Sequence, residues 1–163
     1  MPEVTLRKLV ESDAELLVRW RNENAYAFPK RDEPLTLSEH DEWYISSYLH
    51  DPARAMFVVL ADYFPVGTIG LTIRHGRGEV GNMILGDKSY ARQGIMQEAV
   101  KQMLKAFDLE HYWLKVLPDN YPCIRFYEKL GFSLSSGTVD GCKAMDRRRY
   151  YEDLAEAMSR STP

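Results

Sequence analysis

The chain has 163 residues, of which 45% are hydrophobic and 28% are charged, as in an ordinary soluble domain with one core. Its formal net charge is −3, so it does not have the excess of basic residues that is typical of a nucleic-acid-binding domain. No apolar run approaches the roughly 20 residues of a membrane span, and the first residues lack the apolar core of a secretory signal. We therefore expect a single domain over residues 1–163, located in the cytoplasm, with neither a nucleic acid nor a membrane as its partner.

The first third of the chain reads as one strand and two helices. Alternating apolar and polar residues predict a strand over residues 4–9. A helix follows over residues 12–23, where Ser12 and Glu15 form a capping-box pattern. A second helix is expected to begin near Ser38.

The middle of the chain predicts three strands in a meander. Runs rich in β-branched residues over 55–61 and 66–73 are separated by a short DYFP turn, which indicates an antiparallel hairpin. The turn signal HGRG leads into a further strand over residues 79–85.

A polar loop containing Gly94 then runs into a long amphipathic helix over residues 95–107. Helix starts carry unpaired N–H groups and partial positive charge, so this loop reads either as an anion cradle or as an ordinary helix start. The sum is a mixed α+β sheet in the order β-α-α-β-β-β-α-β-α-β-β. Its last elements are a strand over 112–118, a short helix between Asn120 and Gly131, strands over 132–136 and 142–151, and a terminal helix or frayed tail over 152–159.

Neither the cysteines nor the histidines predict a metal site. Cys123 and Cys142 suggest no disulfide framework, and we interpret them as reduced thiols. The histidines have no metal-ligand spacing among themselves or with the cysteines; they are His40, His50, His75 and His111. We expect no metal.

Two motifs carry a resemblance to a known family. The loop reads ARQGIM over residues 91–96, and the short helix reads NYPCIRFYEKLGF over residues 120–132. Together they resemble the GNAT superfamily of acyl-CoA-dependent N-acetyltransferases, whose patterns are Arg/Gln-x-x-Gly-x-Gly/Ala and Asn-x-x-Ala-x-x-x-Tyr-x-x-x-Gly-Phe. Ala91, Met96 and Cys123 depart from those patterns. The resemblance covers residues 4–150 and is closest in appearance to the ribosomal-protein and nucleotide-linked amino-sugar branches.

The resemblance implies a fold and a co-substrate. The fold is a central mixed, mostly antiparallel twisted sheet of about six to seven strands, with helices on both faces. The co-substrate is acetyl-CoA, whose pyrophosphate would bind at the helix start and whose pantetheine arm would pair with a central strand. The implied cofactor-binding residues are Met83, Ile84, Leu85, Arg92, Gln93, Gly94, Ile95, Met96, Asn120 and Cys123.

The resemblance also suggests catalytic residues. By family position, Tyr127 would donate a proton to the thiolate leaving group, although it shares helical spacing with core residues. Glu79 opens the strand that leads to the loop and is a candidate general base. Tyr44, His40 or a water chain are other options for the base.

The resemblance also implies that the N-terminal helices shape the site of the acceptor, a small-molecule amine. Candidate contacts are Trp20, Arg21, Asn22, His40, Trp43 and Tyr44, although the tryptophans also suit a core. Their pattern resembles the amino-sugar branch. Acetylation of protein α-amino groups, acetylation of an amine antibiotic or another small metabolite, and a non-catalytic acyl-CoA-sensing module remain alternatives.

The C-terminal end contributes two weaker expectations. Three consecutive arginines, residues 147–149, would point to alternate faces of a strand and read mainly as edge or solvated surface. An exposed final strand could pair with a second copy of the chain in a homodimer.

Overall fold

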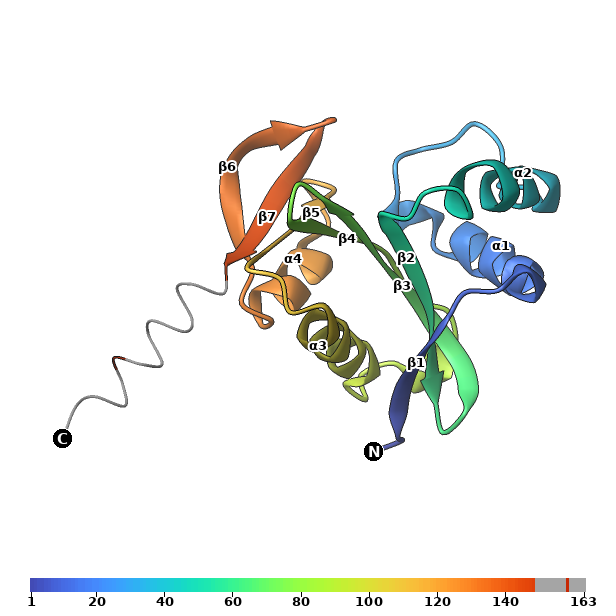
Figure 1. Cartoon of the computed structure of the whole chain (residues 1–163), viewed down its shortest axis with the longest axis horizontal. Coiled ribbons are helices and arrows are strands. Elements are labelled where there is room, and N and C mark those ends of the chain that lie inside the picture. Colours follow the sequence, from blue (N-terminus) through green and yellow to red (C-terminus); the bar gives the residue numbers. More distant parts are fainter. Residues whose placement is uncertain (149–157, 159–163) are drawn as a thin grey trace.

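The computed structural model describes residues 1–148 and Met158, and it contains one seven-stranded sheet (Figure 1). Neighbouring strands are antiparallel except β4 and β5, which are parallel. The spatial order is β1-β2-β3-β4-β5-β7-β6. The strands are β1 (Val4–Lys8), β2 (Arg54–Ala61), β3 (Phe64–Arg74), β4 (Arg77–Leu85), β5 (His111–Val116), β6 (Ser133–Val139) and β7 (Cys142–Arg148).

Within residues 1–148, four α-helices cover the two faces of the sheet. α1 (Ala14–Glu23) and α2 (Leu37–Trp43) lie on one face, and α3 (Ile95–Phe107) and α4 (Tyr121–Glu128) lie on the other (Figure 1). A π-helical turn, Tyr44–Tyr48, continues α2. The expected α+β class and the order of strands and helices are confirmed through β7.

Two local expectations are corrected by the structure. Ser12 does not cap α1; a short 3₁₀ turn, Glu11–Asp13, precedes the helix, and the Asp13 carboxylate accepts hydrogen bonds from Arg7 and from the Val10 N–H. The capping box instead forms between Thr36 and Glu39 at the start of α2. Ionised Asp13 is therefore the residue that organises the entry to α1.

The second correction concerns the C-terminal strands. β7 lies between β5 and β6, so β6 forms that edge of the described sheet and the last strand does not. Arg147 is half-buried and donates to the Leu130 carbonyl, whereas Arg148 is exposed. Arg149 and the expected terminal helix lie outside the described residues, apart from Met158.

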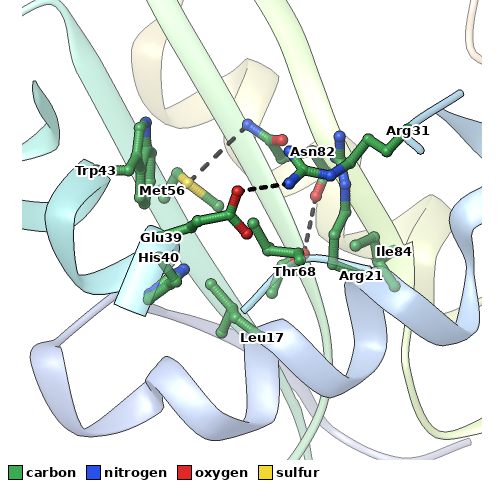
Figure 2. Close-up of a pocket in the computed structure, with 11 residues that line it drawn as sticks. Leu17, Arg21, Arg31, Glu39, His40, Trp43, Met56, Thr68, Asn82 and Ile84 are labelled. Carbon is green, nitrogen blue, oxygen red and sulfur yellow. Dashed lines mark hydrogen bonds and ion pairs between the residues drawn. The ribbon is translucent and has the colours of Figure 1, made fainter. Parts of the chain in front are cut away.

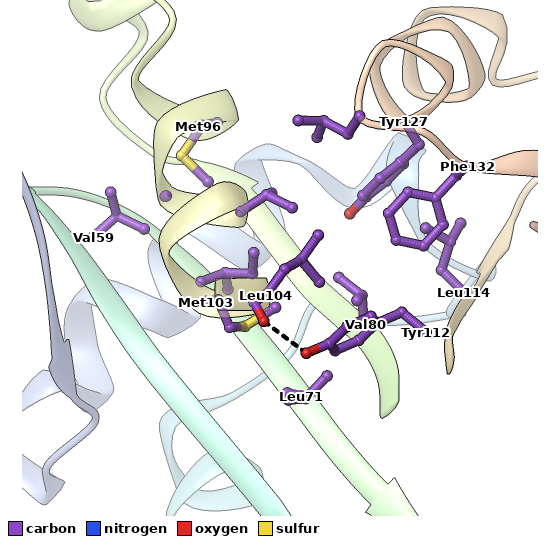
Figure 3. Packing of buried hydrophobic residues seen from close by; sticks show 14 of the residues in the cluster. Val59, Leu71, Val80, Met96, Met103, Leu104, Tyr112, Leu114, Tyr127 and Phe132 are labelled. Carbon is purple, nitrogen blue, oxygen red and sulfur yellow. Dashed lines mark hydrogen bonds between the residues drawn. The ribbon is translucent and has the colours of Figure 1, made fainter. Parts of the chain in front are cut away.

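The main core lies between the sheet and the α3–α4 layer (Figure 3). Ala99, Val100 and Met103 of α3 are fully buried there, as the amphipathic pattern predicts. The buried Tyr112 hydroxyl donates to the Leu104 carbonyl (2.8 Å) and accepts from the Leu109 N–H (2.9 Å), which ties β5 to the end of α3.

The parallel pair at the centre of the sheet is short. β4 pairs with β5 only from Arg77 to Val80, and the rest of β4 pairs with β3 alone. Within the unpaired part, Asn82 adopts a left-handed backbone conformation (φ 51°) at a register shift, and its carbonyl accepts a hydrogen bond from Thr68 (2.8 Å). The two strands therefore diverge and leave one edge of β4 open.

Candidate active site

The open edge of β4 borders a groove of about 700 Å³, which we call the α3 groove. One wall is the end of β4, and the other walls are the start of α3 and one side of α4. Of the ten cofactor-binding residues that the resemblance implies, nine line it: Met83, Ile84, Leu85, Arg92, Gly94, Ile95, Met96, Asn120 and Cys123. Gln93 lies outside, where its side-chain amide donates to the Ser89 carbonyl (3.2 Å).

The backbone at the start of α3 is shaped for an anion. Gly94 is the N-cap residue with φ 76°, and Arg92 is also left-handed with φ 62°. No side chain caps this 13-residue helix, so the first N–H groups of α3 stay available. A Cβ at Gly94 would meet only the Met1 sulfur, at 3.9 Å, so the backbone angle rather than crowding within the chain requires glycine.

The α3 groove therefore fits coenzyme A by two independent features. The uncapped helix start suits a pyrophosphate, and the open edge of β4 suits the amides of an extended pantetheine arm. Met96, in the position where the family pattern has glycine or alanine, is buried and packs inward, close to Gly67. Its side chain thus leaves the backbone of the loop accessible.

Tyr127 lies at the inner end of this region, on α4. Asn120 caps α4 by accepting the Cys123 N–H (3.3 Å), and Pro122 occupies the first turn. The Tyr127 ring is buried edge-on against Phe126 and Phe132 (centroids 5.2 and 5.3 Å), and its hydroxyl donates to the Met83 sulfur (3.4 Å). Burial, with a smaller contribution from Cys123, raises the pKa of Tyr127 above its usual value, so the phenol keeps its proton.

Glu79 and Tyr127 line the same cavity of about 300 Å³ between the diverging strands, which we call the central cleft. The Glu79 carboxylate lies 3.7 Å from the Lys115 ammonium group, which also donates to Asp140 (3.2 Å). The two candidate catalytic residues, 48 positions apart in the sequence, are therefore brought to one place by the fold.

A third cavity lies on the other face of the sheet, between β3, β4 and the α1–α2 layer (Figure 2). We call this 200 Å³ cavity the α2 pocket; Arg21, His40 and Trp43 line it. Desolvation by burial lowers the pKa of His40, partly opposed by Asp41, so the imidazole is favoured in its neutral form. An ion pair between Arg31 and Glu39 (2.8 Å) crosses the mouth of the pocket.

The other three predicted acceptor residues do not line the α2 pocket. Trp20 is only 2% exposed and packs against Gly86, where a Cβ would overlap its ring. Tyr44 is buried in a small core cluster under α1 and α2. Both polar atoms of the Asn22 amide bond the Leu35 backbone (2.8 and 2.9 Å), which fastens the α1–α2 loop. These residues support the walls of the site.

Sequence reasoning missed Arg31, Glu39 and Asn82, which also line the α2 pocket. Arg31 comes from an irregular loop that gave no pattern. Glu39 carried a usable signal, because Thr36 and Glu39 have capping-box spacing. Asn82 could also have been identified from the sequence, since an asparagine between strand residues is typical of a bulge with positive φ.

No group of three or more potential ligands among residues 1–148 and Met158 could hold a metal ion. In the same residues, no helix has both the length and the apolar character needed to cross a membrane.

Comparisons with known proteins agree with this architecture. An N-alpha-acetyltransferase of Saccharolobus solfataricus is 28% identical over 146 residues, which cover 79% of this chain and 81% of that protein. Among solved structures, the aminoglycoside acetyltransferase AAC(6')-Ib with ribostamycin and coenzyme A superposes with a TM-score of 0.80 at 21% identity, covering 93% of this chain and 96% of that one. The Vibrio cholerae spermidine N-acetyltransferase with coenzyme A and spermine gives 0.75 at 20% identity, covering 90% and 96%.

At these identities the solved structures establish a shared fold. The family is established separately, by a family model that describes an acetyltransferase (GNAT) domain and matches residues 3–133. With its split sheet and its acetyltransferase relative, the chain belongs to the GNAT acetyltransferase family, a family of N-acetyltransferases.

Proposed function

We propose that the protein transfers the acetyl group of acetyl-CoA to a primary amine of a small molecule, with a nucleotide-linked amino sugar as the favoured acceptor. One observation carries this proposal. The central cleft shares Met83, Asn120 and Cys123 with the α3 groove, and it shares Arg21 and Asn82 with the α2 pocket. A cofactor on one face and an amine on the other can therefore meet in the cleft, which supports direct attack in a ternary complex.

Acetyl-CoA, bound in the α3 groove, supplies the acetyl thioester. The start of α3 would hold its pyrophosphate, with Arg92 beside it, and the backbone of Met83, Ile84 and Leu85 would hold its pantetheine arm. Cys123 and Asn120 line the groove near the reacting end.

Two side chains in the cleft would move protons. Glu79 would accept the proton that the amine nitrogen loses as it bonds the acetyl carbon, directly or through water. Tyr127 would give its phenol proton to the sulfur as the carbon–sulfur bond breaks. Its hydroxyl already donates to a sulfur atom, that of Met83.

A second acceptor class is favoured by a specific observation. The Saccharolobus solfataricus relative is an N-alpha-acetyltransferase, so a protein α-amino group is the alternative acceptor. A module that binds acyl-CoA without turnover is the alternative from another functional class.

The test is release of free thiol from acetyl-CoA by the purified protein, with amino sugars, nucleotide-linked amino sugars, polyamines and N-terminal peptides as acceptors. Mass spectrometry of the products identifies the acetylated amine. We expect turnover with an amino sugar, and we expect Glu79→Gln to lower kcat/KM by roughly 10²-fold or more. Acetyl-CoA binding without turnover on any amine would favour the sensing module, and turnover on peptides alone would favour the α-amino alternative.

A further inference from the structure

Arg21 is a half-buried cation without an acidic partner in the described part of the chain. It lies in the last turn of α1, and no ion pair or hydrogen bond from its guanidinium group occurs among the described residues. Its guanidinium group lies over the Phe28 ring, whose centroid is 3.3 Å from the guanidinium carbon. Stacking on a ring occupies a face of the guanidinium group and leaves its five N–H donors available in a fixed plane.

The position of Arg21 makes this unsatisfied charge functional. Among the described residues, Arg21 alone lines three cavities: the α2 pocket, the central cleft, and a groove under the α1–α2 loop that we call the loop groove. Glu79 and Tyr127 line the cleft with it. A molecule whose amine lies in the cleft would therefore bring its neighbouring groups within reach of Arg21, which Figure 2 shows in the α2 pocket.

The charged residues around Arg21 do not pair with it. In the loop groove, Asp32 and Glu33 share the lining with Arg21, but neither forms an ion pair with it in the described part of the chain. Glu39 is the acidic residue of the α2 pocket, and it pairs with Arg31 (2.8 Å). In the central cleft, Lys115 bridges Glu79 and Asp140. Burial, helped by the nearby Arg31, lowers the pKa of Arg21 to about 10, so the group is still charged at neutral pH. Burying an uncompensated cation costs free energy, and an anion bound there would recover part of it.

We propose that Arg21 is the specificity determinant of the acceptor site and that it binds an anionic oxygen group, a phosphate or a carboxylate, carried by the amine substrate. This inference rests on the proposed function and narrows it to amines that also bear an anion. Guanidinium matches both groups, because its planar fork donates two parallel hydrogen bonds to either. It disfavours purely cationic acceptors such as spermine, because like charges in a half-buried site repel.

The experiment compares acceptors that differ by one anionic group. Glucosamine is paired with glucosamine 6-phosphate for the phosphate source and with muramic acid for the carboxylate source, and spermine is the cationic acceptor. We expect kcat/KM for at least one anionic member to exceed that of glucosamine by roughly 10- to 100-fold, the range of one or two charge-assisted hydrogen bonds. Which member benefits identifies the anion.

Arg21→Gln should abolish that preference and bring the anionic acceptor down to the level of glucosamine. Arg19→Gln is the matched control, because Arg19 is an exposed arginine on the same helix, and it should keep the preference. Arg21→Lys keeps the charge without the planar fork, so it should retain part of the preference and also serves if Arg21→Gln fails to fold. Equal use of neutral and anionic amines by the unaltered protein, or a preference that survives Arg21→Gln, would overturn the inference while the acetyltransferase proposal stands.

A binding measurement separates the two proposals if no amine is acetylated. The thermal shift that inorganic diphosphate produces is compared between the unaltered protein and Arg21→Gln, with coenzyme A saturating in both so that the start of α3 is already occupied. Acetyl-CoA affinity is the check that each variant is folded. A shift lost only in Arg21→Gln would support the anion site even without turnover. No shift in the unaltered protein, together with no turnover, would reject the inference and the proposed function alike.

Discussion

The cavities on the two faces of the sheet differ in whether backbone or side chains shape them. On the α3–α4 face, the groove is shaped by backbone: the open edge of β4 and the left-handed turn at Gly94. On the α1–α2 face, the pocket is shaped by side chains, chiefly Arg21, His40 and Trp43. A site shaped by backbone follows from the fold and is shared by proteins that have that fold. A site shaped by side chains changes with single substitutions. Solved structures of the same fold, each about 20% identical to this chain, contain ligands as different as ribostamycin and spermine.

The largest expected effect tests whether the reaction takes place in the central cleft, where the cavities of the two faces meet. Tyr127→Phe removes the hydroxyl that contacts the Met83 sulfur but keeps the buried ring. We expect kcat to fall by about 10²- to 10⁴-fold while acetyl-CoA affinity changes little, because the lost group would act on the leaving sulfur. Steady-state kinetics and equilibrium binding of acetyl-CoA measure the two quantities. Tyr121→Phe, at an exposed tyrosine on the same helix, is the control, and equal losses of kcat and affinity would reject the general-acid role.

An intermediate effect tests the backbone-built face. Gly94→Ala places a side chain on the left-handed turn at the start of α3, so acetyl-CoA affinity should fall by roughly 10-fold as one hydrogen bond to the anion is lost. Gly76→Ala is matched in backbone angle (φ 73°) and has open space around it, on the β3–β4 turn. Isothermal titration with acetyl-CoA should show the loss in the first variant alone. An equal loss of acetyl-CoA affinity in Gly94→Ala and Gly76→Ala would show that backbone strain in general, and not the site at the start of α3, causes the effect.

The smallest expected effect tests the side-chain-built face through pH. Burial lowers the pKa of His40 in the folded chain. As the pH falls through about 6.5, His40 is therefore protonated in the unfolded chain while it stays neutral in the folded chain. The free energy of unfolding should therefore decrease as pH falls below about 6.5, and His40→Gln should weaken that decrease. Urea unfolding at pH 7.5 and pH 5.5 measures the difference. The exposed His50→Gln is the control, and an unchanged pH dependence in His40→Gln would show that His40 is not held neutral.

The contrast between the backbone-shaped groove and the side-chain-shaped pocket also decides what could be predicted from the sequence. The order of strands and helices follows from local periodicity, and Asn120 and Tyr127 belong to a motif whose spacing matches one helix. Those residues lie where the motif implies, Asn120 capping α4 and Tyr127 facing β4.

The acceptor side was less predictable for a physical reason. Helical spacing puts Trp20 and Arg21 next to each other at the border between core and cavity, and periodicity cannot say which of them faces the cavity. The structure buries the indole and leaves the guanidinium group in the cleft. The path of the loop that brings Arg31 to Glu39 depends on the Asn22–Leu35 hydrogen bonds, which no local pattern indicates.

The contact between Trp20 and Gly86 also has an evolutionary consequence. Gly86 directly follows β4, so the indole fixes the distance between α1 and the strand that borders the α3 groove. Positions 20 and 86 should therefore vary together among related sequences, since any side chain at 86 needs a smaller ring or an aliphatic residue at 20. Drift at this pair would shift Arg21, one residue along the helix, relative to β4. The side chains tolerated at position 86 therefore limit where Arg21 can lie relative to β4.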